Sequence, residues 1–187
     1  MTMTWVLILV VAGLVLAGVS IYNGLVALRT RAVGAWSDIN VQLKRRHDLV
    51  GNLVETVKGY ASHERQTLEQ VIEARNRATG AAGSGHPRDA GQAENVLTAQ
   101  LRTIFALAEA YPDLKANQNF QELQRALESL ETGIEQARRY YNAVVRDLNT
   151  KIQSVPSVFV ARLFRFEERE FFELADAADG QVPAVKF

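Results

Sequence analysis

The sequence predicts an all-α protein in which an N-terminal transmembrane helix continues into an antiparallel bundle of about four long helices. Three observations support this fold class. The first 28 residues carry no charged side chain, apolar residues then recur every seven positions, and few prolines interrupt the chain. The prolines stand at Pro87, Pro112, Pro156 and Pro183. We expect three parts, which are a transmembrane anchor at 1–28, a helical bundle domain at 29–179 and a C-terminal tail at 180–187.

The composition excludes several classes of protein. Lys plus Arg and Asp plus Glu both number 21, so the formal net charge is zero and the chain has no electrostatic footprint for nucleic acid. There is no cysteine, which excludes disulfides, thiolate metal sites, cysteine nucleophiles and lipid-modified cysteine anchors. The stability of the fold must therefore come from packing.

The apolar segment from Trp5 to Asn23 is long enough to cross a bilayer as a helix, because about 20 residues span the hydrocarbon layer. Trp5 and Tyr22 stand where aromatic rings favour the two interfaces. A cleaved signal peptide is the alternative, but no basic residue precedes the apolar run. Arg29 and Arg31 follow it, so the positive-inside rule places the C-terminal side, with the bundle, in the cytoplasm. We expect a single-pass protein of the inner membrane.

Two series of residues, spaced seven apart, predict a long helix after the membrane segment. They are Val33, Asn40, His47, Val54, Ala61, Leu68 and Trp36, Leu43, Val50, Val57, Glu64, Val71. No proline interrupts residues 1–85, so the sequence allows one continuous helix as far as Thr79. Gly51 and Gly59 weaken it by about 1 kcal/mol each, and we expect at most a modest bend there.

Asn40, His47 and Glu64 are polar members of this seam. We expect them to fix the register of the helices or to reach water at the edge of the seam. The alternative is a ligand-binding or metal-binding protein, or an enzyme, that uses a polar bundle interior around these three residues.

The later helices are predicted from breaks and heptads. Residues 80–89 form a glycine-rich turn with Asp89 as a possible N-cap, and the next helix ends at Pro112. Asn117 or Asn119 is expected to cap a third helix that runs to Ser154. Its heptad residues are Phe120, Leu127, Ile134, Tyr141, Leu148 and Leu123, Leu130, Ala137, Val144. Two shorter helices are expected at 157–164 and 167–178, followed by a loosely held tail.

Several long segments of the sequence resemble one protein family. Residues 35–50 (AWSDINVQLKRRHDLV), 52–61 (NLVETVKGYA) and 108–117 (AEAYPDLKAN) are similar to LemA proteins, as are Phe120, Leu123-Gln124, Ala137-Arg138 and Tyr141-Asn142. The similarity extends over about Tyr22 to Glu173, with Gly51 where the family often has proline. The resemblance implies a bacterial single-pass membrane protein with a bundle of about four antiparallel helices, and it implies no enzyme class.

No pattern for chemistry stands out. His47, His63 and His86 lack metal-ligand spacing, no Glu-x-x-His pairs predict a di-iron site, and no Ser/His/Asp order is distinctive. We therefore expect neither catalytic activity nor a metal or other cofactor. The carboxylates are better explained as solvated faces that pair with Arg65, Arg75 or Arg125.

The leading functional hypothesis is a scaffold or interaction protein that positions or regulates other membrane proteins. Its expected partners are the lipid bilayer, other membrane proteins and a second copy of the chain, with no nucleic acid and no small-molecule substrate. A signalling module is a weaker alternative, because no output domain follows. The residues expected to contact partners or lipid are Lys44, Arg45, Arg46, Tyr111, Asn117 and Asn119. A self-capping buried corner is the favoured alternative for Tyr111, Asn117 and Asn119.

Overall fold

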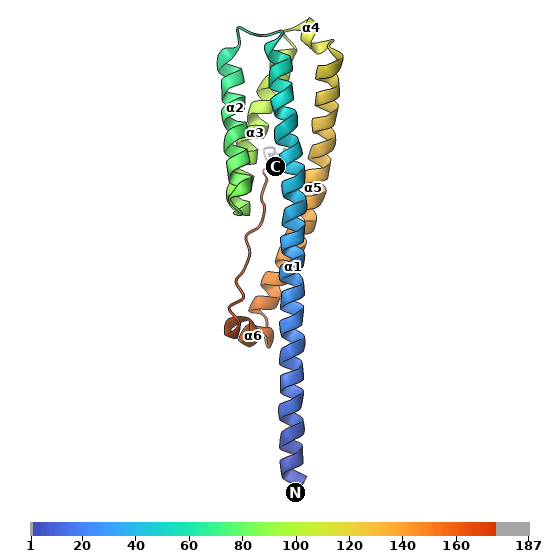
Figure 1. Cartoon of the computed structure of the whole chain (residues 1–187), viewed down its shortest axis with the longest axis vertical. Coiled ribbons are helices and arrows are strands. Elements are labelled where there is room, and N and C mark those ends of the chain that lie inside the picture. Colours follow the sequence, from blue (N-terminus) through green and yellow to red (C-terminus); the bar gives the residue numbers. More distant parts are fainter. Residues whose placement is uncertain (1, 175–187) are drawn as a thin grey trace, which may run out of the picture. The chain divides into compact units, whose positions relative to one another are not determined.

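The computed structural model describes residues 2–174, and these residues form helices and connecting segments without a β-strand. The helices are α1 (Thr2–Lys58), α2 (Arg65–Gly83), α3 (Pro87–Ala108), α4 (Pro112–Lys115), α5 (Gln118–Gln153) and α6 (Ser157–Leu163) (Figure 1). The all-α class and the long N-terminal apolar helix are therefore confirmed. The predicted tail at 180–187 lies outside the described residues.

The chain divides into two compact units. Unit 1 consists of Met1–Asp38 and Arg139–Phe171, and unit 2 consists of Ile39–Arg138 and the residues from Phe172 onward. Both α1 and α5 contribute one part to each unit. Each unit has its own apolar core, and each is described by itself below.

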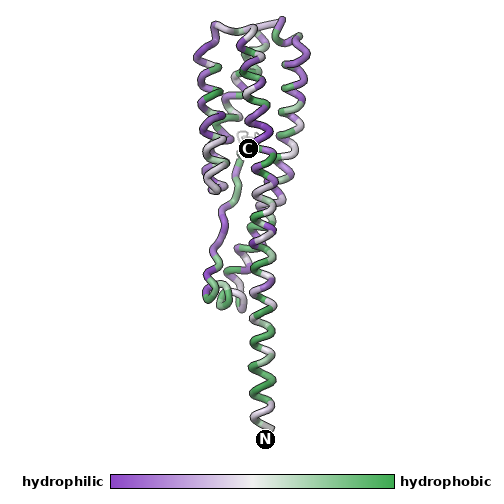
Figure 2. The backbone as a smooth tube through the Cα atoms, in the orientation of Figure 1, coloured by the Kyte–Doolittle hydropathy of each residue, from purple (hydrophilic) through white to green (hydrophobic). Residues whose placement is uncertain are grey.

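The first part of α1 is apolar and exposed. Its large side chains from Met3 to Val19 are each at least half exposed, and the hydropathy colouring shows this stretch as almost continuously hydrophobic (Figure 2). By length and composition, α1 is the one described helix that could cross a membrane, and none of its apolar window is buried. Nothing within the described chain therefore compensates for the exposure of these side chains to water.

The core of unit 1 begins where this exposed stretch ends. Leu25 is fully buried and packs with Leu148, Ile152 and Ala161. Farther along α1, the ring of Trp36 lies 5.5 Å from that of Tyr141, which is itself fully buried. The unit is thus closed by α5 and α6 packing along α1 between residues 21 and 38.

Tyr141 makes the stability of unit 1 sensitive to alkaline pH. Its hydroxyl donates to the Glu170 carbonyl oxygen at 2.9 Å, and burial raises its pKa above the ordinary value of 10.0, although the charge of Arg169 partly opposes this. The unfolded chain ionises first, so the stabilisation is complete below pH 10 and is lost as pH rises through the folded pKa. Tyr141→Phe should therefore lose less stability between pH 8 and pH 11 than the unmodified chain, measured by urea unfolding in detergent micelles.

The adjacent Tyr140 provides the control, because it is 56% exposed. Tyr140→Phe should keep the full alkaline loss of stability. At neutral pH, Tyr141→Phe should cost about 1 kcal/mol for the lost hydrogen bond. Equal alkaline losses in the two variants would contradict the assignment to Tyr141.

Unit 2 holds a larger core, in which α2 turns back beside the end of α1 and α3 turns back beside α2 (Figure 1). Its members come from α1, the turn that contains Ala61, α2, α3, α4 and α5. The buried residues are Val50, Leu53, Val54, Val57, Ala61, Leu68, Val71, Ala74, Ala78, Leu97, Leu101, Ile104, Ala108, Leu114, Phe120 and Leu127. Eight of these are predicted heptad residues, so part of the seam identified from the sequence lies in the core of this unit.

The predicted continuous helix to Thr79 is wrong, because α1 ends at Lys58 and α2 starts at Arg65. Gly59 lies at the break, where its low helix propensity favours a turn. The amide nitrogens of Tyr60 and Ala61 both donate to the Val57 carbonyl oxygen, at 3.0 and 2.8 Å. A turn of six residues returns the chain to nearly the same heptad phase, so periodicity alone did not reveal the break.

Two further predictions are corrected. The glycine-rich turn is shorter than expected, because α2 continues to Gly83 and α3 begins at Pro87. Gly85 has a φ of +78°, which glycine adopts without steric cost. The N-cap of α3 is His86, and Asp89 lies in the first turn, where its charge favours the helix dipole.

The short helix predicted at 167–178 is also wrong for its described part, since residues 164–174 are not helical. Side chains of α5 hold this backbone extended. Asn149 donates to the Arg169 carbonyl oxygen at 2.9 Å, and Arg138 donates to that of Leu174 at 2.9 Å. Residues 175–178 lie outside the described part of the chain.

Candidate functional site

The most distinctive polar feature of unit 2 is a buried charge cluster centred on Glu94. The Glu94 side chain, from α3, is fully buried. Nη1 of Arg46 donates to one of its carboxylate oxygens at 2.9 Å, and Nε2 of His47 lies 2.6 Å from the other. Arg46 and His47 are adjacent on α1 and each is 3% exposed. Both oxygens of the buried carboxylate are therefore paired.

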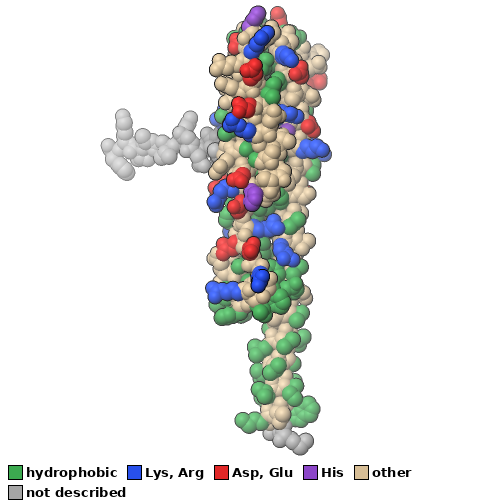
Figure 3. Space-filling model, turned by 60° about the vertical axis from the view of Figure 1, so that its left-hand side comes forward, with side chains coloured by type: hydrophobic (Ala, Val, Ile, Leu, Met, Phe, Trp, Pro, Cys, Tyr) green, Lys and Arg blue, Asp and Glu red, His purple; other side chains and the backbone are tan. Residues whose placement is uncertain are grey.

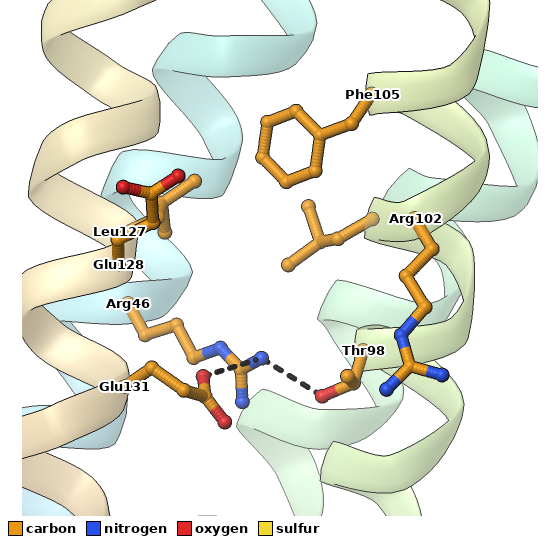
Figure 4. Close-up of a pocket in the computed structure, with 8 residues that line it drawn as sticks. Arg46, Thr98, Arg102, Phe105, Leu127, Glu128 and Glu131 are labelled. Carbon is orange, nitrogen blue, oxygen red and sulfur yellow. Dashed lines mark hydrogen bonds and ion pairs between the residues drawn. The ribbon is translucent and has the colours of Figure 1, made fainter. Parts of the chain in front are cut away.

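Arg46 extends the cluster to α5. Its Nη2 atom donates to Thr98 Oγ1 at 2.8 Å and lies 3.1 Å from Glu131 Oε2, as the close-up shows (Figure 4). The Glu131 side chain is 51% exposed. One guanidinium thus connects a fully buried carboxylate with one that reaches water.

His47 extends the cluster to α2. Its Nδ1 atom lies 3.2 Å from Thr79 Oγ1, and its backbone carbonyl oxygen accepts from Nε of Arg75 at 2.6 Å. Thr79 also donates to the Arg75 carbonyl oxygen at 2.9 Å. The cluster therefore joins α1, α2, α3 and α5, with hydrogen bonds that satisfy the buried charges.

A pocket of about 160 Å³ lies against the Arg46 end of this cluster (Figure 4). The wall of the pocket is mainly apolar, and charged groups of both signs lie at its edge. The lining residues are Arg46, Thr98, Leu101, Arg102, Phe105, Leu127, Glu128 and Glu131. A cavity of this size accommodates a small ring or a short alkyl group.

The three polar seam residues predicted as an alternative site have different surroundings. His47 belongs to the cluster, whereas Glu64 accepts a hydrogen bond from the Tyr111 hydroxyl at 3.2 Å. The Oδ1 atom of Asn40 is buried without a hydrogen-bond partner in the described structure. Asn40, His47 and Glu64 therefore share no common set of hydrogen bonds.

Sequence reasoning missed Glu94, which is the centre of the cluster. A signal was present, because Glu94 is three residues before Leu97 and seven before Leu101, both of which face the core. A carboxylate on the apolar face of a helix is rarely buried unless it is paired. The helical periodicity of α3 could therefore have identified it, although it could not have named Arg46 and His47 as partners.

The polar corner around α4 is built as a cap. Asn117 Oδ1 accepts from the Phe120 amide at 3.0 Å, and Asn117 Nδ2 donates to the Tyr60 hydroxyl at 2.8 Å. The structure thus assigns the cap of α5 to Asn117. Asn119 is exposed and lines an open hollow of about 380 Å³ with Asn52 and Thr56. The pKa of Tyr111 is raised, first by burial and then by the hydrogen bond to Glu64 and the negative charge of the Glu64 carboxylate.

Asn117→Ala should lower the free energy of unfolding by about 1 kcal/mol, because it removes the side-chain acceptor at the start of α5. Asn119→Ala is the matched control, and it should change the stability by less than about 0.5 kcal/mol because Asn119 is on the surface. Urea unfolding of the full chain in micelles measures both. Equal effects would show that the corner is not capped by Asn117.

The predicted basic contact residues differ in accessibility. Lys44 and Arg45 are exposed, whereas Arg46 is buried in the charge cluster. Only the first two therefore have side chains at the surface of unit 2. Among residues 2–174, no group of three or more histidine, aspartate or glutamate side chains is arranged to hold a metal ion.

These features define an all-helical protein with one candidate membrane-spanning helix and a buried, fully paired charge cluster in its folded part. The chain belongs to the LemA family, whose sequence profile matches residues 35–187. The resemblance seen in residues 35–61 and 108–117 is thereby confirmed.

The chain is also similar to magnetosome proteins. It is 24% identical over 182 residues to magnetosome protein MamQ of Magnetospirillum gryphiswaldense, an alignment that covers 84% of this chain. Magnetosome proteins MamQ 1 and MamQ 2 of Paramagnetospirillum magneticum match it with the same identity and coverage. The chain spans 66% of the length of these relatives.

Proposed function

We propose that this chain is a single-pass membrane-anchored scaffold or interaction protein without catalytic activity, which positions or regulates other membrane proteins. The observation that carries the proposal is the exposed apolar stretch of α1 from Met3 to Val19. Such a stretch is unfavourable in water and favourable in lipid. Membership of the LemA family supports a membrane-associated protein.

Residues 1–28 are the proposed anchor and residues 29–179 the proposed functional domain. Arg29 and Arg31 are exposed just beyond the apolar stretch. The positive-inside rule then favours a cytoplasmic domain on the inner membrane.

The charge cluster supports a structural role better than a catalytic one. Glu94 has both oxygens paired, and Arg46 is held by Glu94, Glu131 and Thr98. A catalytic acid or base must reach a substrate proton, and a fully buried carboxylate without an open side does not. We therefore assign the cluster to fixing the register of four helices.

The proposed partner surfaces are those that expose polar groups without an evident internal role. Lys44 and Arg45 present two positive charges on α1, and Asn119 borders the open hollow beside Asn52. These positions suit another membrane protein or a second copy of the chain. Tyr111 and Asn117 are assigned to the internal corner instead, because both make hydrogen bonds across it.

Site-specific photo-crosslinking in native membranes tests this proposal. A photoreactive residue at position 45 or 119 should give reproducible adducts with another membrane protein or a second copy. The same residue at Glu69, which is exposed on α2, serves as the comparison. Adducts from none of these positions, together with no co-purifying protein in mild detergent, would refute the scaffold role.

A second candidate function is binding of a small anionic ligand, and the pocket beside Arg46 is the observation that favours it. A ligand with an apolar ring and a carboxylate would place the ring among Leu101, Phe105 and Leu127 and displace Glu131 from Arg46. Benzoate is a suitable probe. If this function is correct, benzoate raises the melting temperature of the full chain in micelles, and Leu101→Trp, which fills the pocket, abolishes that rise.

A further inference from the structure

The segment that includes α6 exposes an unusual number of large apolar side chains. Val155, Phe159, Leu163 and Phe164 are 77%, 65%, 75% and 54% exposed. Clusters of this kind on soluble domains usually mark a contact surface. The space-filling view shows hydrophobic side chains gathered on unit 1 where the apolar stretch of α1 emerges from it (Figure 3).

The position of α6 within unit 1 indicates what covers this surface. Ala161 packs against Leu25 of α1, and the ring of Phe164 lies 4.7 Å from that of Tyr22. The exposed apolar stretch ends at Val19, six residues before Leu25, which corresponds to about 9 Å along the helix. The headgroup layer of each leaflet is roughly 5–8 Å thick. If α1 spans the bilayer, α6 therefore lies at the depth of the lipid headgroups.

Basic groups accompany these apolar side chains. Arg162 and Arg165 are both exposed. The guanidinium of Arg29 lies 5.1 Å from the centre of the Phe166 ring, and the Lys151 amine lies against Gly24. Two exposed carboxylates, Glu167 and Glu168, follow Phe166, and Glu168 accepts a hydrogen bond from Gln153 at 2.8 Å. Apolar and cationic side chains are the combination that binds an anionic membrane surface.

The backbone at Arg165, just after the end of α6, has an unusual conformation for a residue with a side chain. The Phe166 amide donates to the Ala161 carbonyl oxygen at 2.9 Å, and that of Arg165 donates to Arg162 at 3.3 Å, which forms a Schellman motif. Arg165 has a φ of +55° at the position where glycine is usual. A strained residue of this kind often marks a functional requirement.

We propose that residues 155–166 form a second membrane contact, with Phe159, Leu163 and Phe164 inserted at the boundary of headgroups and acyl chains. Arg162 and Arg165 bind the headgroups of anionic lipids. This inference rests on the proposed anchor, and it adds that the folded part of unit 1 is itself held on the bilayer surface. The partner is lipid rather than protein, because the surface continues directly from the apolar stretch of α1.

Site-directed spin labelling measures the depth of this segment. Because the chain has no cysteine, single cysteines at Phe159, Val10 and Tyr140 can each carry a nitroxide in the full chain. The vesicles contain phosphatidylcholine and phosphatidylglycerol. Tyr140 is a control in the same unit that lies farther from the bilayer. Its neighbour Tyr141 contacts Trp36. Trp36 is 11 residues beyond Leu25, which corresponds to about 16 Å along α1.

The accessibility of the label to a water-soluble nickel complex should be lowest at Val10, intermediate at Phe159 and highest at Tyr140. The label at Phe159 should be several-fold less accessible than that at Tyr140, and accessible to oxygen. Equal accessibility at Phe159 and Tyr140 with a protected Val10 would overturn the second contact and leave the anchor intact. High accessibility at all three positions would overturn the anchor itself.

The role of the two arginines is tested in the same system. Replacing both, as Arg162→Gln and Arg165→Gln, should raise the nickel accessibility at position 159 in vesicles that contain phosphatidylglycerol. The same pair of replacements should change little in phosphatidylcholine alone. No change in either vesicle would overturn the assignment of these arginines to anionic headgroups.

Discussion

Glu94→Leu is expected to lower the free energy of unfolding by about 3–5 kcal/mol, which is the usual cost of leaving a buried charge uncompensated. The variant removes both acceptors from Nη1 of Arg46 and Nε2 of His47, and these side chains are each 3% exposed. Arg46 keeps Glu131 and Thr98, whereas His47 keeps only Thr79 among the side-chain contacts described above. Urea unfolding of the full chain in micelles, followed by circular dichroism, measures the loss.

Two further variants separate the charge effect from the loss of packing. Glu131→Leu removes the half-exposed carboxylate, and it should cost no more than about 1 kcal/mol because surface ion pairs contribute little. The triple variant Arg46→Met, His47→Leu, Glu94→Leu replaces the buried charges together and should recover most of the stability. A Glu94→Leu effect as small as that of Glu131→Leu would show that the cluster does not stabilise the fold.

The triple variant also distinguishes the two candidate functions. If the cluster only fixes helix register, a stable triple variant keeps its cross-links to partners in native membranes. If the Arg46 pocket binds an anion, the triple variant stays folded but no longer responds to benzoate. The cross-linking and the benzoate measurements both use this one variant. A difference in folding therefore cannot explain why one result changes and the other does not.

The core was largely predictable because helix packing repeats with a period that the sequence displays. Val50, Val54 and Val57 occupy heptad positions and are all buried. Val33 belongs to the same series and yet is 50% exposed. A helix with 3.6 residues per turn drifts by about 20° per heptad, so the apolar face rotates away from a strict seven-residue series. Ala32, one residue before Val33, is fully buried instead, whereas Trp36 of the companion series is buried as predicted.

Features that depend on contacts distant in sequence were not predictable. The apolar pattern of residues 167–174 resembles a helix, but Tyr141, Asn149 and Arg138 bind its carbonyl groups from α5. Similarly, His47 was identified as polar on an apolar seam, whereas its partner Glu94 lies 47 positions away. Periodicity places a residue on a face of its own helix, and it does not say which residue of another helix is opposite.

The double variant Val10→Arg, Val15→Arg is expected to abolish stable membrane attachment. Residues 5–19 contain ten valine, leucine and isoleucine residues, which favour insertion by about 0.3–0.6 kcal/mol each. Each arginine near the centre of the span opposes insertion by about 2.5–3.5 kcal/mol. Two arginines therefore offset the whole apolar contribution. Carbonate extraction of cell membranes measures the result, because a spanning protein stays in the pellet and is released by detergent.

The matched control is Ile72→Arg, Val96→Arg, because these side chains are 41% and 47% exposed on α2 and α3 of unit 2. This variant should remain in the membrane pellet, and Val10→Leu, Val15→Leu should behave like the unmodified chain. Both variants thus replace two exposed aliphatic side chains by arginine, and they differ in where the replacements lie in the chain. If the Val10 and Val15 arginine variant resists carbonate as well as the control does, α1 is not the anchor, and the headgroup depth inferred for α6 has no basis.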